Sequence, residues 1–209
     1  MSVSRPVLWL MVCAITTVTL SAAEPSGDWP QWRGPQRDNI STFKGLAKDW
    51  TAAAPKLLWT VKGLGGGYAS VSISDGRLYT TGNRDGGQYL VAVDLNTHEV
   101  AWSTLIGDKG LNHGYEGSRS TPAIDGDRAY VVSSNGSIAC VNTADGRLVW
   151  QREFKEFGGK MMTGWGFSES PLVDGEHVLC TPGGPEAMIV CLDKLTGTDV
   201  WKAAVPDFG

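Results

Sequence analysis

The sequence lacks several features that would assign it to a class of function directly. It contains no run of Lys or Arg, and its 22 Asp and Glu outnumber 18 Lys and Arg to give a net charge of −4. Binding to nucleic acid needs clustered positive charge, so this class of partner is excluded. The three His are scattered and show no zinc-ligand spacing, so no metal site is predicted.

Motifs for nucleotide binding and nucleophilic catalysis are also missing. The glycine-rich residues 63–67 do not open a helix after a strand, so we interpret them as a loop rather than a phosphate-binding turn. Ser168 lacks both the following glycine and the strand-to-helix turn of a nucleophile elbow. No cluster of carboxylates of the kind that a calcium site needs is present. No catalytic residue can therefore be assigned.

Long hydrophobic runs are confined to the N-terminus. Arg5 precedes an apolar stretch over residues 7–20 that is short for a membrane span, and Ser21-Ala22-Ala23 suits cleavage before Glu24. We interpret residues 1–23 as a signal peptide, with an uncleaved anchor helix as the alternative. The protein is thus expected to be exported to the periplasm or cell envelope, with no transmembrane span after cleavage.

A sequence motif that ends in tryptophan occurs three times along the chain. Its copies cover residues 92–102, 139–150 and 190–201, and each has an acid or amide eight positions before the tryptophan. The paired residues are Asp94 and Trp102, Asn142 and Trp150, and Asp193 and Trp201. An Asp-Gly pair and a β-rich run precede each copy, which sets a period of about 50 residues. This period, with its Gly/Asp/Asn turns, is typical of a four-stranded propeller blade.

The repeat predicts an all-β fold, a β-propeller of four-stranded blades. In the second unit the strands are expected, from the channel outward, at residues 120–124, 129–133, 137–141 and 147–150. Asx-Gly pairs that tolerate tight hairpins separate them. The units cover about residues 67–102, 118–150 and 168–201 of a partial propeller that spans 57–209.

The segment before the repeats, residues 24–56, has a different composition and is interpreted as an irregular N-terminal arm. Its Trp29 and Trp32 are costly to leave in water, so both are expected to pack against the body of the fold. Residues 57–61 then look like the tail of a repeat, with Trp59 in the place of the later tryptophans. We therefore expect about three blades and one additional outer strand.

Three blades fall short of a ring, because propellers typically close with four to eight. The strand at Trp59 would normally complete the last blade of the closed ring. We therefore expect the chain to be the N-terminal part of a longer protein or the product of a truncated reading frame. An unclosed arc would expose strand edges that can pair with other chains.

The motif Ala-x-Asp-x-x-Thr-Gly-x-x-x-Trp resembles the tryptophan-docking repeat of the pyrroloquinoline-quinone-type β-propellers. This group includes quinoprotein alcohol dehydrogenases and the outer-membrane assembly protein BamB. The best copy, residues 193–201, contains Gly197 of the Thr-Gly pair, whereas the earlier copies have His98 and Gly146 there. The resemblance implies that each Trp packs between adjacent blades and that the acid and Thr-Gly fix the turn that presents it. The arm sequence DWPQWRGPQRD is similar to the start of exported bacterial proteins of this group.

Three cysteines remain after the signal peptide: Cys140, Cys180 and Cys191. Cys140 and Cys191 occupy the same repeat position, and successive blades would hold them too far apart for a disulfide. Neighbouring strands of one blade leave a Cys180–Cys191 bridge as an alternative. We expect buried free thiols.

Two loops that lead into inner strands, residues 105–120 and 157–170, are expected to form the mouth of the channel. They carry Asn112, His113, Tyr115, Glu116, Arg119, Lys160, Met161, Met162, Trp165 and Glu169. We interpret Arg119 and Glu169 as matching positions, each flanked by serines before an inner strand. The pair either lines the channel or forms a structural ion pair between neighbouring blades, and the ion pair is favoured.

The resemblance to quinoprotein dehydrogenases implies a quinone between a Trp and an adjacent-cysteine disulfide, beside calcium. On that basis Trp165 is the candidate stacking residue, and Glu169 or Asn112 a candidate calcium ligand. With Arg119, Trp165 and Glu169 form the candidate cofactor-binding set. The chain has no Cys-Cys pair, so a cofactor is not required, and pyrroloquinoline quinone with calcium is the alternative.

The composition and the resemblance together favour a binding or protein-interaction scaffold in the bacterial envelope. Its partner would be a protein, contacted through mouth residues such as Tyr115 and Met161-Met162, or a small-molecule ligand. The alternative is a quinone-dependent alcohol or sugar dehydrogenase whose remaining blades lie beyond residue 209.

Overall fold

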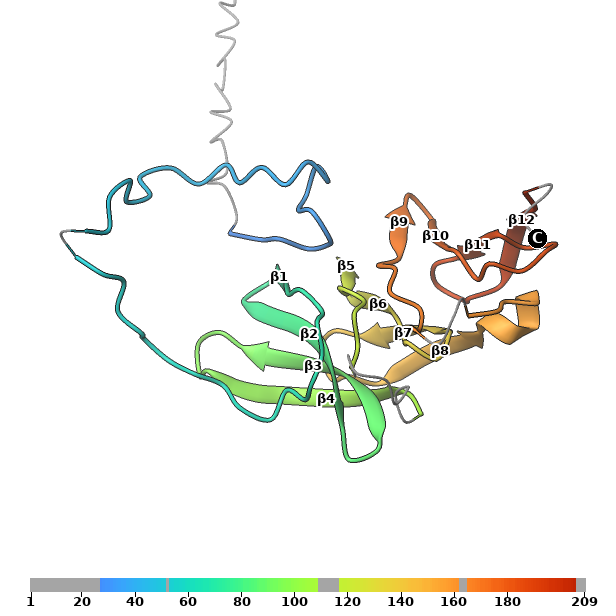
Figure 1. Ribbon diagram of the computed structural model, residues 1–209, viewed down its shortest axis with the longest axis horizontal. Coiled ribbons are helices and arrows are strands. Elements are labelled where there is room, and N and C mark those ends of the chain that lie inside the picture. The colour runs from blue at the N-terminus through green and yellow to red at the C-terminus, as the bar shows by residue number, and fades with distance from the viewer. Residues whose placement is uncertain (1–26, 52, 109–116, 162–164, 206–209) are drawn as a thin grey trace, which may run out of the picture.

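The fold is nearly all-β and consists of three antiparallel sheets of four strands each (Figure 1). The computed structural model describes residues 27–51, 53–108, 117–161 and 165–205. The first blade contains β1 (Ser72–Ser74), β2 (Arg77–Arg84), β3 (Gly87–Asp94) and β4 (Glu99–Gly107). The second contains β5 (Ala123–Asp125), β6 (Arg128–Val132), β7 (Ser137–Asn142) and β8 (Leu148–Glu153), followed by the short 3-10 helix η1 (Phe154–Phe157). The third contains β9 (Leu172–Asp174), β10 (His177–Cys180), β11 (Ile189–Asp193) and β12 (Asp199–Ala203).

In each blade the strands follow one another in sequence order across the sheet. This arrangement confirms the expected fold class, a β-propeller of four-stranded blades. Among the described residues, no helix has the length and apolar character needed to cross a membrane. The predicted signal peptide lies outside the described residues.

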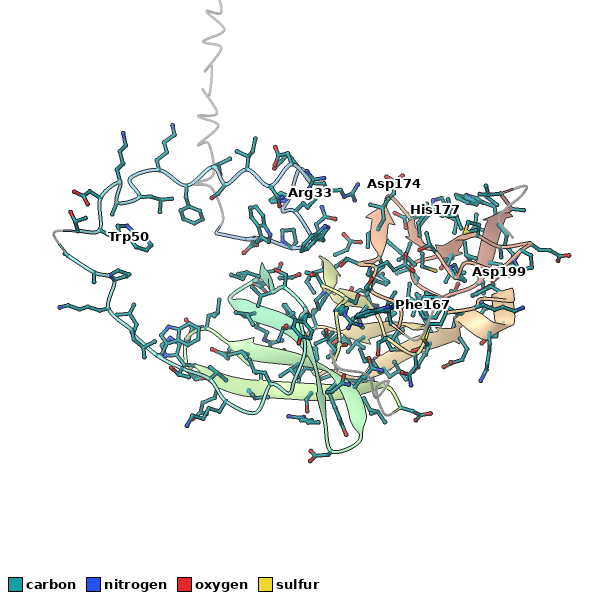
Figure 2. All side chains as sticks on the ribbon, viewed as in Figure 1. Arg33, Trp50, Phe167, Asp174, His177 and Asp199 are labelled. Carbon is teal, nitrogen blue, oxygen red and sulfur yellow. The ribbon has the colours of Figure 1, made fainter. Side chains whose placement is uncertain are left out.

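The middle strands of the second blade, β6 and β7, are buried on both faces, because a blade lies on each side of them. Ala129, Val131, Ala139 and Val141 pack with the first blade. Tyr130, Val132, Ile138 and Cys140 alternate with them and pack with the third. Phe167 joins this second core edge-on to Phe154, and Figure 2 shows it between the two blades. The period of two thus places successive side chains in two different cores.

The tryptophan of one blade docks on a turn of the next. The indole Nε1 of Trp102 donates to the Thr143 carbonyl at 3.0 Å, and that of Trp150 donates to the Lys194 carbonyl at 3.0 Å. Their rings lie over glycines in the following blade: a Cβ at Gly146 would be 2.7 Å from the Trp102 ring, and one at Gly197 equally close to Trp150. The turn therefore receives the tryptophan of the preceding blade, rather than presenting its own.

The receiving turn is built by the acid or amide of the repeat. The Asp193 carboxylate accepts from the backbone N–H of Leu195 and Thr196, and the Asn142 amide oxygen accepts from that of Ala144 at 2.9 Å. These Asx turns leave Gly146 and Gly197 at positive φ, the region that glycine enters at no steric cost. The Thr196 hydrogen bonds lower the pKa of the Asp193 carboxyl.

A β-bulge precedes each repeat tryptophan. In the first blade Trp102 lies opposite Ala92, but the next residue of β3 lies opposite Val100, so Ala101 is the additional residue. The same shift occurs before Trp150 and Trp201. Bulges increase local strand twist and re-aim side chains. The repeated bulge therefore accompanies the tryptophan's turn toward the neighbouring blade.

Trp59 docks on the first blade, but residues 57–61 form no strand. Its ring stacks on His98 with centroids 4.6 Å apart and planes at 16°. His98 occupies the place of Gly146 and also has a positive φ, 59°. The outer position of the first sheet is filled by β4, so the segment around Trp59 has no neighbouring strand to complete a ladder. The expected additional outer strand is thus chain without regular secondary structure.

The first two tryptophans of the arm, Trp29 and Trp32, differ in how far they are buried. Trp29 is half-buried and pairs through its main chain with Ile73 of β1. The expectation that Trp32 packs against the body is wrong, because this side chain is 55% exposed. Trp32 lies inside the turn closed by the Gly34 N–H and the Gln31 carbonyl, and side chains within such a turn point outward.

The three cysteines are free and buried, as expected. Cys191 lies opposite Leu179, so Cys180 projects from the other face of the sheet. The side chains of Cys180 and Cys191 therefore point apart and cannot form a disulfide. Burial raises the pKa of the Cys140 thiol to about 12. These thiols are therefore core side chains.

Gly146→Ala should destabilise the fold more than Gly126→Ala. Both glycines lie in the second blade at positive φ, 75° and 54°, where a Cβ alone costs about 1–2 kcal/mol. Only at Gly146 would the Cβ also meet the Trp102 ring, whereas nothing lies within 4 Å at Gly126. We expect the Gly146 variant to lose about 1–3 kcal/mol more in urea unfolding. Equal losses would mean that the indole contact is not tight.

Candidate functional site at the channel mouth

The segments that lead into the three inner strands meet at one end of the blades. Strand pairing fixes their alignment, because Ile73, Ile124 and Val173 each occupy the middle of an inner strand opposite the second residue of the next. Five residues before these positions lie Tyr68, Arg119 and Ser168. Arg119 therefore aligns with Ser168, and Glu169 aligns with Ser120.

This alignment corrects the interpretation of Arg119 and Glu169 as matching positions. The two are offset by one residue, and such a shift sends side chains in opposite directions. Among the described residues Glu169 forms no ion pair, and its carboxylate instead accepts from the backbone N–H of Thr181 at 2.8 and 2.9 Å and from the Thr181 hydroxyl. The favoured ion pair between neighbouring blades is therefore wrong.

Glu169 extends the pairing of β9 with β10. Its counterpart Ser120 does the same in the second blade, where its Oγ accepts from the Val132 N–H at 3.1 Å. Burial raises the pKa of the Glu169 carboxyl, and the Thr181 hydrogen bonds oppose this effect. The carboxylate thus holds the start of an inner strand in place.

Arg119 connects the mouth segments of all three blades. Its guanidinium donates through Nη1 to the Trp165 carbonyl at 2.5 Å, in the loop that leads to the third blade. The same guanidinium lies 5.9 Å from the ring centroid of Tyr68, before the first blade. The Tyr68 and Trp165 side chains are 62% and 54% exposed, and Arg119 is partly buried between blades. We call Tyr68, Arg119 and Trp165 the mouth cluster.

Sequence reasoning singled out Arg119 and Trp165 but not Tyr68. The alignment of Tyr68 with Arg119 was available from the inner-strand patterns, yet the first unit has no proline to mark it. Several other predicted mouth residues lie outside the described residues. They are Asn112, His113, Tyr115, Glu116 and Met162.

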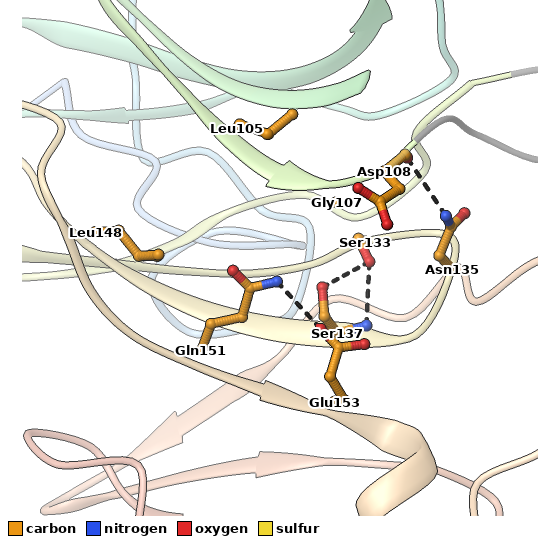
Figure 3. Close-up of a pocket in the computed structure, with 9 residues that line it drawn as sticks. All are labelled: Leu105, Gly107, Asp108, Ser133, Asn135, Ser137, Leu148, Gln151 and Glu153. Carbon is orange, nitrogen blue, oxygen red and sulfur yellow. Dashed lines mark hydrogen bonds between the residues drawn. The ribbon is translucent and has the colours of Figure 1, made fainter. Parts of the chain in front are cut away.

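A small polar cavity lies nearby, between the first and second blades (Figure 3). It has a volume of about 280 Å³ and is lined by Leu105, Gly107, Asp108, Ser133, Asn135, Ser137, Leu148, Gln151 and Glu153. Ser133 and Ser137 share a hydrogen bond of 2.8 Å, and Gln151 donates to the Ile106 carbonyl at 3.2 Å. Ligand pockets are usually larger and more apolar, so this cavity suits bridging water between blades.

The described residues do not fit a quinone–calcium site. Both carboxylate oxygens of Glu169 are held by Thr181, and the Trp165 ring is more than half exposed rather than enclosed. No three His, Cys, Asp or Glu side chains gather as ligands within the part of the chain that the structure describes.

Glu169→Gln should change how stability depends on pH. Burial raises the folded-state pKa of this carboxyl above its unfolded value, so folding favours the protonated form. That stabilisation is fully present below the unfolded pKa and is lost as the pH rises through the folded pKa. In urea unfolding between pH 7 and pH 4, the unsubstituted protein should therefore gain stability relative to the variant as the pH falls.

The matched control is Glu186→Gln, which changes an exposed glutamate in the β10–β11 loop of the same blade. It should not reproduce the pH dependence. Parallel profiles for the unsubstituted protein and Glu169→Gln would contradict the burial of the carboxyl.

Comparison with known sequences gives a family for most of the chain. The model of the family described as "Outer membrane protein assembly factor BamB" matches residues 44–207. The BamB of Alteromonas naphthalenivorans is 30% identical over 118 residues, which are 53% of this chain and 28% of that protein. The BamB of Escherichia coli K12 is 29% identical over 116 residues, 52% of this chain and 27% of that protein. The aligned part of the chain thus spans little more than a quarter of these relatives.

Two solved structures share the fold. The quinohemoprotein alcohol dehydrogenase from Comamonas testosteroni superposes with a TM-score of 0.61 at 20% identity, over 84% of this chain and 27% of that chain. A europium-containing methanol dehydrogenase gives a TM-score of 0.60 at 17% identity, over 85% and 32%. At these identities the likeness concerns the fold alone.

The match over residues 44–207 shows that this chain belongs to the family of the outer membrane protein assembly factor BamB.

Proposed function

We propose that this protein is an exported scaffold of the bacterial envelope that binds another protein through the mouth cluster. The observation that carries the proposal is the meeting of Tyr68, Arg119 and Trp165 at one end of the blades. Tyr, Trp and Arg are the residues most enriched in binding hot spots, because they offer large contact area and several hydrogen-bond donors.

The cluster is well suited to contact with a folded surface or a peptide. Two large aromatic side chains are more than half exposed, and the Arg119 guanidinium is held by the main-chain carbonyl of Trp165. A side chain that is already fixed loses little conformational entropy on binding. The positive charge and the aromatic faces together favour a partner segment that carries a carboxylate beside apolar side chains.

The relatives are named as factors of outer membrane protein assembly, which supports an envelope partner and an envelope location. Residues 1–23, as a signal peptide, would deliver the chain to the periplasm. A small-molecule ligand at the mouth remains the alternative that the same cluster would serve, through stacking on Trp165.

A photo-crosslinking amino acid at position 68 or 165 should capture the same discrete protein in the producing cell. The matched control is position 96, where Asn96 is exposed on the turn between β3 and β4. We expect no such adduct there. The captured protein should be a component of the outer membrane assembly machinery, identified by mass spectrometry.

With that partner purified, Arg119→Ala should weaken binding by at least tenfold, since hot-spot truncations cost about 2 kcal/mol or more. Adducts at all three positions alike, or none at 68 and 165, would overturn the scaffold proposal. Saturable quenching of tryptophan fluorescence by pyrroloquinoline quinone with calcium, abolished by Trp165→Ala, would instead support the ligand alternative.

A further inference from the structure

The three inner strands leave one main-chain edge each on the side of the propeller axis. Within the sheets β1, β5 and β9 are hydrogen-bonded on one side, to β2, β6 and β10, so the N–H and C=O groups of their other edges are not used by the sheets themselves. The middle residues Ile73, Ile124 and Val173 hold the same register, opposite Leu78, Ala129 and Val178. Equivalent groups of three blades therefore face the axis at one level.

The N-terminal arm binds all three of these positions. Trp29 exchanges two main-chain hydrogen bonds with Ile73, at 2.8 and 2.9 Å. The next residue, Pro30, accepts from the Ile124 N–H at 2.7 Å. Arg37 then reaches the third blade, where its Nη2 donates to the Val173 carbonyl at 2.6 Å. One short segment thus contacts the same backbone position in successive blades.

The segment is shaped for this task by its own contacts. Gly34 is buried beneath Trp29, and a Cβ there would lie 2.7 Å from the indole. The Arg37 Nε donates to Gln31 at 3.1 Å, which aims the guanidinium. Arg33 and Arg37 have positive φ values of 68° and 59°, a conformation that persists in non-glycine residues only when surroundings impose it.

We propose that residues 29–37 form an axial strap that covers the inner edges of the blades and closes the axis at the end of the Asp-Gly hairpins. Figure 1 shows this blue segment beside the end of β1, with β5 and β9 following it toward the right of the view. The mouth cluster lies at the opposite ends of the same inner strands, because Tyr68 and Arg119 precede β1 and β5. The strap therefore leaves the mouth as the open end and fixes the spacing of the three inner strands.

Residue-resolved hydrogen exchange on the full chain tests the strap. Gly34→Ala should displace it, because the new Cβ meets the Trp29 ring and the φ of 83° disfavours alanine. The amides of Ile73 and Ile124 should then exchange at least tenfold faster, while the Val91 amide in β3 stays protected. Gly45→Ala is the matched control, since Gly45 has a φ of 77° in the same arm but nothing within 4 Å.

The proposal would be overturned if the Ile73 and Ile124 amides kept their protection in Gly34→Ala. It would also be overturned if these amides exchanged as fast in Gly45→Ala as in Gly34→Ala. If Gly34→Ala also exposes Val91, the variant has unfolded and Arg37→Ala decides. That variant removes the contact with the third blade and the hydrogen bond to Gln31 but leaves the pairing of Trp29 with Ile73, so the Asn39 amide, bonded to the Arg33 carbonyl at 3.0 Å, should exchange at least tenfold faster with Ile73 unchanged. An unchanged Asn39 amide would contradict the strap.

Discussion

The docking of Trp102 and Trp150 on a turn of the next blade is the interaction on which the rest of the structure depends. Four-stranded sheets of this size are marginal alone, and each buries its faces only against a neighbour. Trp102 and Trp150 set the distance and angle of that neighbour through one indole hydrogen bond and one glycine contact each. The Asx turn and the β-bulge are the local devices that make this contact repeat.

The parts of the fold that arise from local sequence could be predicted from it. The period, the Asp-Gly hairpins and the tryptophan motif predicted the blades, because turn chemistry and the alternation of side chains along a strand act within a few residues. Trp59 was recognised as a repeat tryptophan, but its segment forms no strand because a ladder needs a neighbour that local pattern does not supply. The exposed Trp32 shows the same limit, since composition does not say which side of a turn faces the protein.

The candidate site depended on the alignment of the repeats, which the sequence fixes through the Asp-Gly pairs at residues 125 and 174 rather than through the serines. Arg119 and Glu169 look equivalent beside their serines, yet strand pairing aligns Glu169 with Ser120 and turns it toward Thr181. Tyr68 was missed because the first unit has no proline to mark its alignment with Arg119. The contacts of the arm with three blades could not be predicted, because two of them use only main-chain groups and the third joins the Arg37 side chain to a carbonyl 136 residues away.

The two ends of the inner strands thus have different characters. One end carries the exposed Tyr68 and Trp165 side chains and a guanidinium held by a main-chain carbonyl, and the other is covered by main-chain pairing with the arm. Both depend on the blades being held in order by the docked tryptophans. A double-mutant cycle between Trp102→Ala and Gly146→Ala tests this dependence most directly. The account predicts that the double variant is more stable than the sum of the single losses by about 1–3 kcal/mol, because removal of the indole relieves the clash. Additive losses would contradict it.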